Sequence, residues 1–71
     1  MPVDTITRPT PREAEVLQGV WDGLTAKAIG LKLTMSPRTV ETHVNNLMRK
    51  LRATTRTQLC RIALTEGWLS L

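Results

Sequence analysis

The segment 36–51, SPRTVETHVNNLMRKL, most constrains the fold, because its apolar residues recur with the 3.6-residue period of an α-helix. Ser36 and Pro37 suit the N-cap and the first position of that helix. The apolar stripe comprises Val40, Val44, Leu47, Met48 and Leu51. The opposite face carries Arg38, Thr42, Asn45, Asn46 and Arg49, flanked by Thr39, Glu41 and Lys50. Since such groups reach base edges and phosphates, the pattern predicts a helix that packs with one face and binds nucleic acid with the other.

A first helix is predicted well ahead of this segment. Residues 10–13, TPRE, form a capping box with proline at the first helical position, and Gly23 suits the end of the helix. Its buried stripe comprises Val16, Leu17, Val20 and Trp21.

A short second helix is predicted over about 26–33, capped by Thr25, with Ile29 and Leu33 inward and Ala28 between them. Thr34 and Met35 then form a tight turn before the next cap. Two helices joined by a turn of three to four residues are typical of the helix-turn-helix motif.

A fourth helix is predicted over about 56–66, after a polar loop at 52–54. Residues 55–58, TRTQ, match a second capping box, and Gly67 suits the end of the helix. One apolar patch, of Leu59, Ile62 and Ala63, would close the core. A second patch, about 90° away on the helical wheel, comprises Thr57, Cys60 and Leu64, with Arg61 beside it. The second patch is either further wrapped by this small domain or an isologous dimer surface.

The fold class indicated is therefore all-α, a four-helix bundle that contains a helix-turn-helix. Seventy-one residues make one small domain, placed at 10–71 after a flexible arm or linker at 1–9. The single cysteine excludes an internal disulfide, and with one histidine a Cys/His zinc site is not expected. We expect no metal and no cofactor.

Composition narrows the classes of function. With no Phe, no Tyr and two Trp, the chain lacks a stacking platform for single-stranded nucleic acid. No apolar run approaches the roughly 20 residues of a membrane span, and residues 1–9 do not resemble a secretory signal, so we expect a cytoplasmic protein without a membrane partner. An enzyme is not indicated, because the chain has no readable nucleophile–base pair, glycine-rich phosphate loop or carboxylate pair.

The basic charge is concentrated in one part of the chain. Residues 1–37 hold four basic and four acidic side chains, which cancel. Residues 38–61 hold six basic side chains against Glu41 alone, a local net charge of +5. This distribution fits a polyanion partner, although a solvated and solubilising face explains it equally well.

Three segments resemble the LuxR/GerE-type helix-turn-helix domain of bacterial transcription regulators. They are TPREAEVLQGVWDGLTAKAIGLKL, SPRTVETHVNNLMRKL and TRTQLCRIAL, which together cover about residues 10–66. The resemblance implies a third helix that enters the major groove, a fourth that commonly mediates dimerisation, and DNA sites that tend to be imperfect inverted repeats. It also assigns contacts. Glu41, Thr42 and Asn45 match the family's base-contacting positions, and Asn46 could reach either a base or a phosphate.

Phosphate contacts are expected from cations, hydroxyls and helix N-termini at the rim of the groove. The candidates are Thr25, Lys27, Ser36, Arg38, Thr39, His43, Arg49 and Lys50, among which His43 matches a family histidine. The dimer candidates are Thr57, Cys60, Arg61 and Leu64. We therefore predict a sequence-specific regulator that binds double-stranded DNA as a homodimer. The alternatives are a module that pairs with another regulator or with RNA polymerase, and a basic bundle that binds nucleic acid without specificity.

Four positions depart from the family pattern. Trp21 replaces a residue that is usually small, so it must find space in the core or lie partly exposed. Gly30 lies in the interior of the second helix, where glycine is expected to cost roughly 0.5–1 kcal/mol relative to alanine. Thr34 and Arg52 stand where glycine is common, so these turns must either adopt a left-handed conformation at some cost or take another form.

Overall fold

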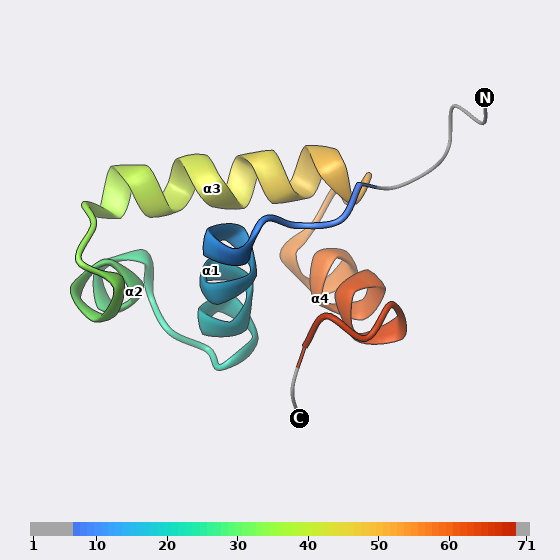
Figure 1. Cartoon of the computed structure of the whole chain (residues 1–71), viewed down its shortest axis with the longest axis horizontal. Coiled ribbons are helices and arrows are strands. Elements are labelled where there is room, and N and C mark those ends of the chain that lie inside the picture. The colour runs from blue at the N-terminus through green and yellow to red at the C-terminus, as the bar shows by residue number, and fades with distance from the viewer. Residues whose placement is uncertain (1–6, 70–71) are drawn as a thin grey trace.

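The computed structural model describes residues 7–69, and these residues form four α-helices and no strand (Figure 1). The helices are α1 (Pro11–Trp21), α2 (Ala26–Leu33), α3 (Pro37–Lys50) and α4 (Arg56–Thr65). The all-α prediction is confirmed, and α2 spans the predicted residues. The fourth helix ends at Thr65, one residue earlier than predicted, with Glu66 as its C-cap.

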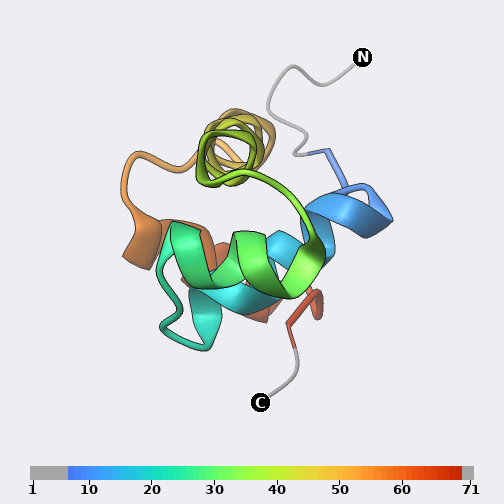
Figure 2. The ribbon, with the colours of Figure 1, turned by 90° about the vertical axis from the view of Figure 1, so that its left-hand side faces the viewer.

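The long helix α3 lies across the other three (Figures 1 and 2). It packs against α1, α2 and α4, while α2 and α4 lie on opposite sides of α1. The first turn of α1 is close to α3, and α1 then runs away from it, so the C-terminal end of α1 is on the side remote from α3. One face of α3 therefore covers the core and the other is left outside.

Each helix begins with a threonine or serine whose side chain accepts a hydrogen bond from a backbone N–H three residues later. These caps are Thr10, Thr25, Ser36 and Thr55. The capping box of α1 is complete, because Glu13 Oε1 accepts from Thr10 N–H at 2.9 Å. The prediction of a second capping box at the start of α4 is wrong in one of its two bonds. Gln58 Oε1 accepts from Thr54 N–H at 2.7 Å, rather than from the N-cap residue Thr55.

The core is formed by aliphatic side chains from all four helices. Val16, Leu17, Val40, Leu47, Leu51, Leu59 and Ala63 are completely buried, and Ile29 and Val44 nearly so. Met48, Leu33 and Ile62 pack against this cluster. The predicted stripe of α3 and the core patch of α4 are confirmed.

Two predicted positions need correction. Trp21, placed in the buried stripe of the first helix, is 36% exposed in the last turn of α1, so of the two alternatives for this large side chain it lies partly exposed. Ala53, in the predicted polar loop, is buried in the core cluster.

The glycine at position 30 is unfavourable for helix propensity, and its presence is explained by packing. A Cβ built there would overlap the carbonyl oxygen of Met35 in the turn after α2. The turn therefore approaches α2 more closely than any side chain would allow. The expected propensity cost of Gly30 stands beside a steric requirement that the sequence did not reveal.

The turns at Thr34 and Arg52 adopt the left-handed conformation, with φ of 59° and 57°. For residues other than glycine this conformation costs roughly 1–2 kcal/mol, and Thr34 is also β-branched. The C-terminal end of α2 is supported from α1, because Arg12 donates a hydrogen bond to the Leu33 carbonyl at 2.6 Å. This bond satisfies one of the carbonyls that a helix end leaves without an intrahelical partner.

The predicted arm at 1–9 is described only in part. Residues 1–6, like 70–71 at the end of the predicted domain, lie outside the described residues. Thr7 N–H donates to the Lys50 carbonyl at 3.1 Å, so the chain enters α1 alongside the end of α3.

Candidate nucleic-acid interface

The face of α3 that does not pack on the core is a continuous exposed surface. We call it the outer face of α3, and it consists of Arg38, Thr39, Glu41, Thr42, Asn45 and Arg49. Four of these residues, Arg38, Glu41, Thr42 and Asn45, line one polar hollow. The structure thus brings three of the four candidates for base contact together with Arg38, a candidate for phosphate contact, while Asn46 lies outside this hollow.

The polar groups of this hollow differ in whether they are already bonded. Thr42 Oγ1 donates to the Arg38 carbonyl at 3.1 Å, so the hydroxyl proton is already used within the helix. Within the described residues, Glu41 and Asn45 have no hydrogen-bonding partner for their side chains. Their carboxylate and amide groups are therefore available to a ligand without breaking an internal bond.

The start of α3 offers one free amide. Pro37 has no N–H, Thr39 N–H bonds to Ser36 Oγ at 3.1 Å, and Val40 N–H bonds to the Ser36 carbonyl at 3.0 Å. The Ser36 and Thr39 hydroxyls also bond to each other at 2.9 Å. Only the Arg38 N–H of this turn remains without an acceptor among the described residues, at a helix end that favours anions.

The second helix presents a similar start. Thr25 Oγ1 accepts from Ala28 N–H at 3.1 Å, so its hydroxyl serves as a cap. Lys27, in the first turn of α2, is exposed, and no described acid lies within ion-pair distance of it. The same holds for Arg38, so both cations keep their full charge for a polyanion.

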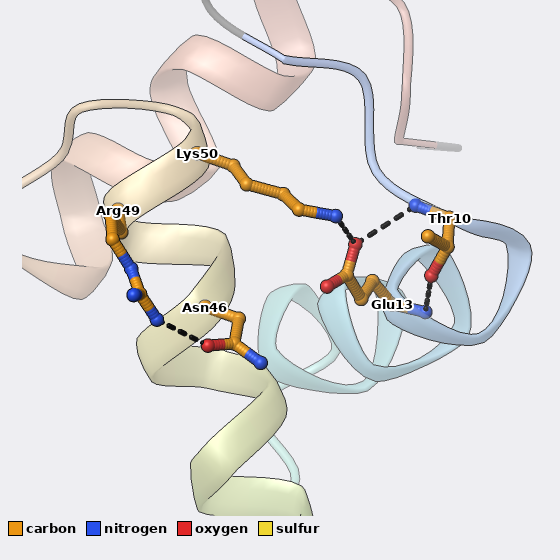
Figure 3. A network of polar contacts seen from close by, with 5 residues as sticks. All are labelled: Thr10, Glu13, Asn46, Arg49 and Lys50. Carbon is orange, nitrogen blue, oxygen red and sulfur yellow. Dashed lines mark hydrogen bonds and ion pairs between the residues drawn. The ribbon is translucent and has the colours of Figure 1, made fainter.

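The two cations at the end of α3 are held differently (Figure 3). Lys50 Nζ lies 2.6 Å from Glu13 Oε1, which also accepts from Thr10 N–H, so this ammonium is committed to α1. Arg49 Nη2 donates to Asn46 Oδ1 at 2.5 Å, a neutral partner that leaves the arginine charge uncompensated. Of the two, Arg49 is the one available to an anion.

Glu13 is the buried charged group among the described residues, at 5% exposure. Burial raises the pKa of Glu13. Hydrogen bonds from Lys50 and Thr10, together with the charge of Lys50, lower that pKa by a larger amount, so the pKa lies below its ordinary value of 4.5. Sequence reasoning identified Glu13 as a capping residue and missed its ion pair, since the two partners are 37 residues apart.

His43 lies at the border between the packed and the outer faces of α3. The ring is partly buried, and its Nδ1 is buried without a hydrogen-bond partner among the described residues. Nε2 is therefore the ring nitrogen through which this side chain could bond to a ligand.

The second face of α4 forms one wall of an apolar groove. The groove is lined by Val20 and Trp21 from the end of α1, by Gly23 and Leu24 from the connection that follows, and by Arg56, Thr57, Cys60, Arg61 and Leu64 from α4. All four residues predicted for a dimer interface line it. The structure adds Trp21, which sequence reasoning did not connect with this surface, and Leu64 is 37% exposed beside it.

Cys60 is mostly buried in this wall, at 9% exposure. Burial raises the pKa of the Cys60 thiol, and the nearby Arg56 charge offsets only part of that effect. The thiol is therefore protonated at neutral pH and behaves as a small apolar side chain.

Two further observations concern the described residues. No group of three or more His, Cys, Asp or Glu side chains in residues 7–69 is arranged to hold a metal ion. None of the four helices is both long and apolar enough to cross a membrane.

Two capped helices joined by a short turn, with the second presenting a free polar face, define a helix-turn-helix domain. A family model described as "Bacterial regulatory proteins, luxR family" matches residues 10–63, and the chain belongs to this family of DNA-binding transcription regulators. The resemblance found in the sequence is confirmed.

Solved structures and curated relatives agree with this assignment. The structure of the transcription factor GerE superimposes with a TM-score of 0.82 at 34% identity, covering 86% of this chain and 91% of GerE. The Vibrio cholera VqmA–ligand–DNA complex gives a TM-score of 0.80 at 31% identity, covering all of this chain and 31% of VqmA.

The transcriptional regulatory protein FixJ of Bradyrhizobium diazoefficiens is 38% identical over 61 residues, or 86% of this chain. The transcriptional activator SolR of Ralstonia solanacearum is 47% identical over 58 residues, or 82% of this chain. The chain spans 30% of the length of FixJ and 25% of that of SolR.

Proposed function

We propose that α3 is the recognition helix of a sequence-specific regulator, and that its outer face enters the major groove of double-stranded DNA. The observation that carries this proposal is the polar hollow, in which Arg38, Glu41 and Asn45 are exposed and unbonded while the opposite face of the same helix is buried. A helix that only solubilised the domain would not need such groups gathered at one place. A regulator of this kind acts in the bacterial cytoplasm, where the chromosome lies.

Base contacts are assigned to three residues in the hollow. Asn45 suits adenine, because its free amide can donate to N7 and accept from N6. The Thr42 methyl suits the thymine methyl group, since its hydroxyl is already bonded to the Arg38 carbonyl. Glu41 suits the amino group of cytosine, and the Arg38 charge in the same hollow moderates its repulsion by phosphates.

Phosphate contacts are assigned around this hollow. Lys27 and Arg38 supply unpaired charge, and the free Arg38 N–H supplies a backbone donor. Ser36, Thr39 and Thr25 act first as caps, so their part is to present the helix starts. His43 can donate to a phosphate through Nε2, and Lys50 is excluded from the main set because its ammonium is bound to Glu13.

We further propose that two copies bind an inverted repeat and pair through the groove between α1 and α4. Support comes from the apolar lining of the groove and from two large, partly exposed side chains, Trp21 and Leu64. The groove lies at the end of α1 remote from α3, so pairing would leave both outer faces free. The same groove could instead hold another regulator or RNA polymerase, which is the alternative function.

Site selection from a random duplex pool, followed by titration at two salt concentrations, tests the proposal. We expect an enriched sequence with inverted-repeat symmetry, bound more tightly than random duplex, with an affinity that falls steeply as salt rises. Lys27→Ala and Arg38→Ala should weaken binding to both duplexes and reduce the salt slope by about one each. Lys32→Ala is the matched control, because this exposed lysine of α2 lines a different hollow, against α1. Unchanged affinity and slope in the two variants would refute the DNA-binding role of this face.

A further inference from the structure

The bond between Asn46 and Arg49 fixes what each of these side chains can do in a groove. Asn46 is partly buried on α3, and its Oδ1 accepts from Arg49 Nη2 at 2.5 Å (Figure 3). Asn45, the preceding residue, has no such bond among the described residues. Two adjacent asparagines on one helix therefore have different amounts of free hydrogen-bonding capacity.

The occupied oxygen restricts Asn46. An asparagine that recognises adenine uses both ends of its amide, accepting from N6 with Oδ1 and donating to N7 with Nδ2. With Oδ1 turned to Arg49, the remaining capacity of Asn46 is mainly that of a donor. This arrangement suits an acceptor-only partner such as a phosphate oxygen better than the adenine edge.

The position of Arg49 along the helix favours a phosphate as well. Arg38 and Arg49 are separated by eleven residues, or about 16 Å of helix, whereas the major groove is about 12 Å wide. When the N-terminal half of α3 is inserted, Arg49 lies near the rim, where the backbone runs. Its charge is uncompensated, because its partner is neutral and the neighbouring Lys50 takes the buried acid Glu13.

We infer that Asn46 is a positioning residue, whose carbonyl oxygen orients the Arg49 guanidinium toward a phosphate at the rim of the groove, and that Asn46 does not select a base. An arginine has five N–H donors and one is used here, so the fork keeps four for the phosphate. Holding the long side chain in advance reduces the rotamer entropy lost on binding. This inference rests on the proposed DNA-binding function of α3.

A double-mutant cycle on the selected duplex and on a random duplex tests the inference. Arg49→Ala is expected to weaken both complexes about equally and to lower the salt slope by about one. Asn46→Ala should also weaken both equally, by roughly threefold to tenfold, without altering the preference for the selected sequence. The loss of affinity in the double variant should match that of Arg49→Ala alone, because Asn46 acts only by orienting the Arg49 guanidinium.

Two further variants separate orientation from charge and from folding. Arg49→Lys keeps the charge but lacks the fork, so Asn46→Ala should have little further effect in that background. Asn45→Ala is the matched control. Its effect should fall on the preference between duplexes and should add to that of Arg49→Ala. Thermal unfolding of each variant checks that the domain remains folded.

The outcomes distinguish this inference from the proposed function. If the wild-type chain discriminates between the duplexes but the effects of Asn46→Ala and Arg49→Ala add, or if Asn46→Ala alters the base preference, Asn46 acts on its own and the inference is wrong. If the wild-type chain binds neither duplex, the proposed function and the inference both fail, because an oriented Arg49 then has no phosphate to meet.

Discussion

Lys50 Nζ lies 2.6 Å from Glu13 Oε1, and this ion pair joins the last turn of α3 to the first turn of α1 (Figure 3). The same carboxylate oxygen closes the capping box with Thr10 N–H. One buried oxygen therefore fixes the start of α1 and the end of α3 at once. The ion pair ties the helix that we propose enters DNA to the first turn of α1.

Removing either partner of this pair should destabilise the domain. Lys50→Met leaves the Glu13 carboxylate buried without its cation, and we expect a loss of about 1–3 kcal/mol in the free energy of unfolding. Glu13→Gln keeps an oxygen for Thr10 and should lose less. Urea unfolding at neutral pH measures both. The exposed pair Arg12–Glu15 is the control, since Glu15→Gln should change stability by well under 1 kcal/mol.

The same pair predicts an acid-sensitive part of the stability. Because the pKa of Glu13 in the folded chain lies below the ordinary 4.5, the carboxylate stabilises the fold at higher pH, and that contribution is lost as pH falls from 4.5 through the lowered value. The difference in unfolding free energy between the wild type and Glu13→Gln should thus be full at neutral pH and shrink as pH falls below 4.5. A difference that stays constant down to pH 3 would contradict this account.

Gly30→Ala should destabilise the domain although alanine is the better helix former. The added Cβ meets the Met35 carbonyl oxygen in the tight turn, which is backbone and cannot rotate away. Overpacking of this kind typically costs about 1–3 kcal/mol, more than the gain of roughly 1 kcal/mol in helix propensity. Chemical denaturation measures the net change in the free energy of unfolding. Leu31→Ala, at a 77% exposed position of the same helix, should be nearly neutral.

Thr34→Gly should stabilise the turn between α2 and α3. Thr34 has a φ of 59°, which glycine adopts without the steric cost of a Cβ, so we expect a gain of up to about 1 kcal/mol after the extra entropy of unfolded glycine is subtracted. Gly23→Ala is the reciprocal variant. Its φ is 80° in open space, and it should lose about 1–2 kcal/mol. Equal melting temperatures for the wild type and both variants would show that left-handed strain is negligible here.

Glu41→Gln should change specificity more than affinity. Removing the carboxylate reduces repulsion by phosphates, so random duplex should bind somewhat more tightly. Discrimination at one base pair of the selected site should fall by about 1–3 kcal/mol. Competition binding against duplexes altered at single positions measures this. Uniform tightening on all duplexes, without loss of discrimination, would show that Glu41 does not contact a base.

Leu64→Arg should prevent pairing through the groove between α1 and α4. A third arginine in this groove, in place of an apolar side chain, would be buried by a second copy, whereas the monomer leaves it in solvent at a position already 37% exposed. Sedimentation with and without the inverted-repeat duplex should show loss of the dimer, while half-site binding remains. Leu31→Arg, on the exposed side of α2, serves as the control. If Leu64→Arg left the dimer intact, the interface would have to lie elsewhere.

The helices and their buried faces can be predicted from the sequence, because caps and apolar periodicity are local. Ser36 and Pro37 marked the start of α3, and the spacing of Val40, Val44 and Leu47 identified its buried side. Which polar groups remain free for a ligand depends on how the helices pack against one another. In the sequence, nothing distinguishes Lys50 from the other cations of the basic segment, and only the fold places Glu13 beside it. The fold also places Trp21 and Leu64 in the same groove. At position 30, it requires glycine because the Met35 carbonyl lies so close. These outcomes depend on distances between residues remote in the chain, or on the path of a turn, which no local pattern specifies.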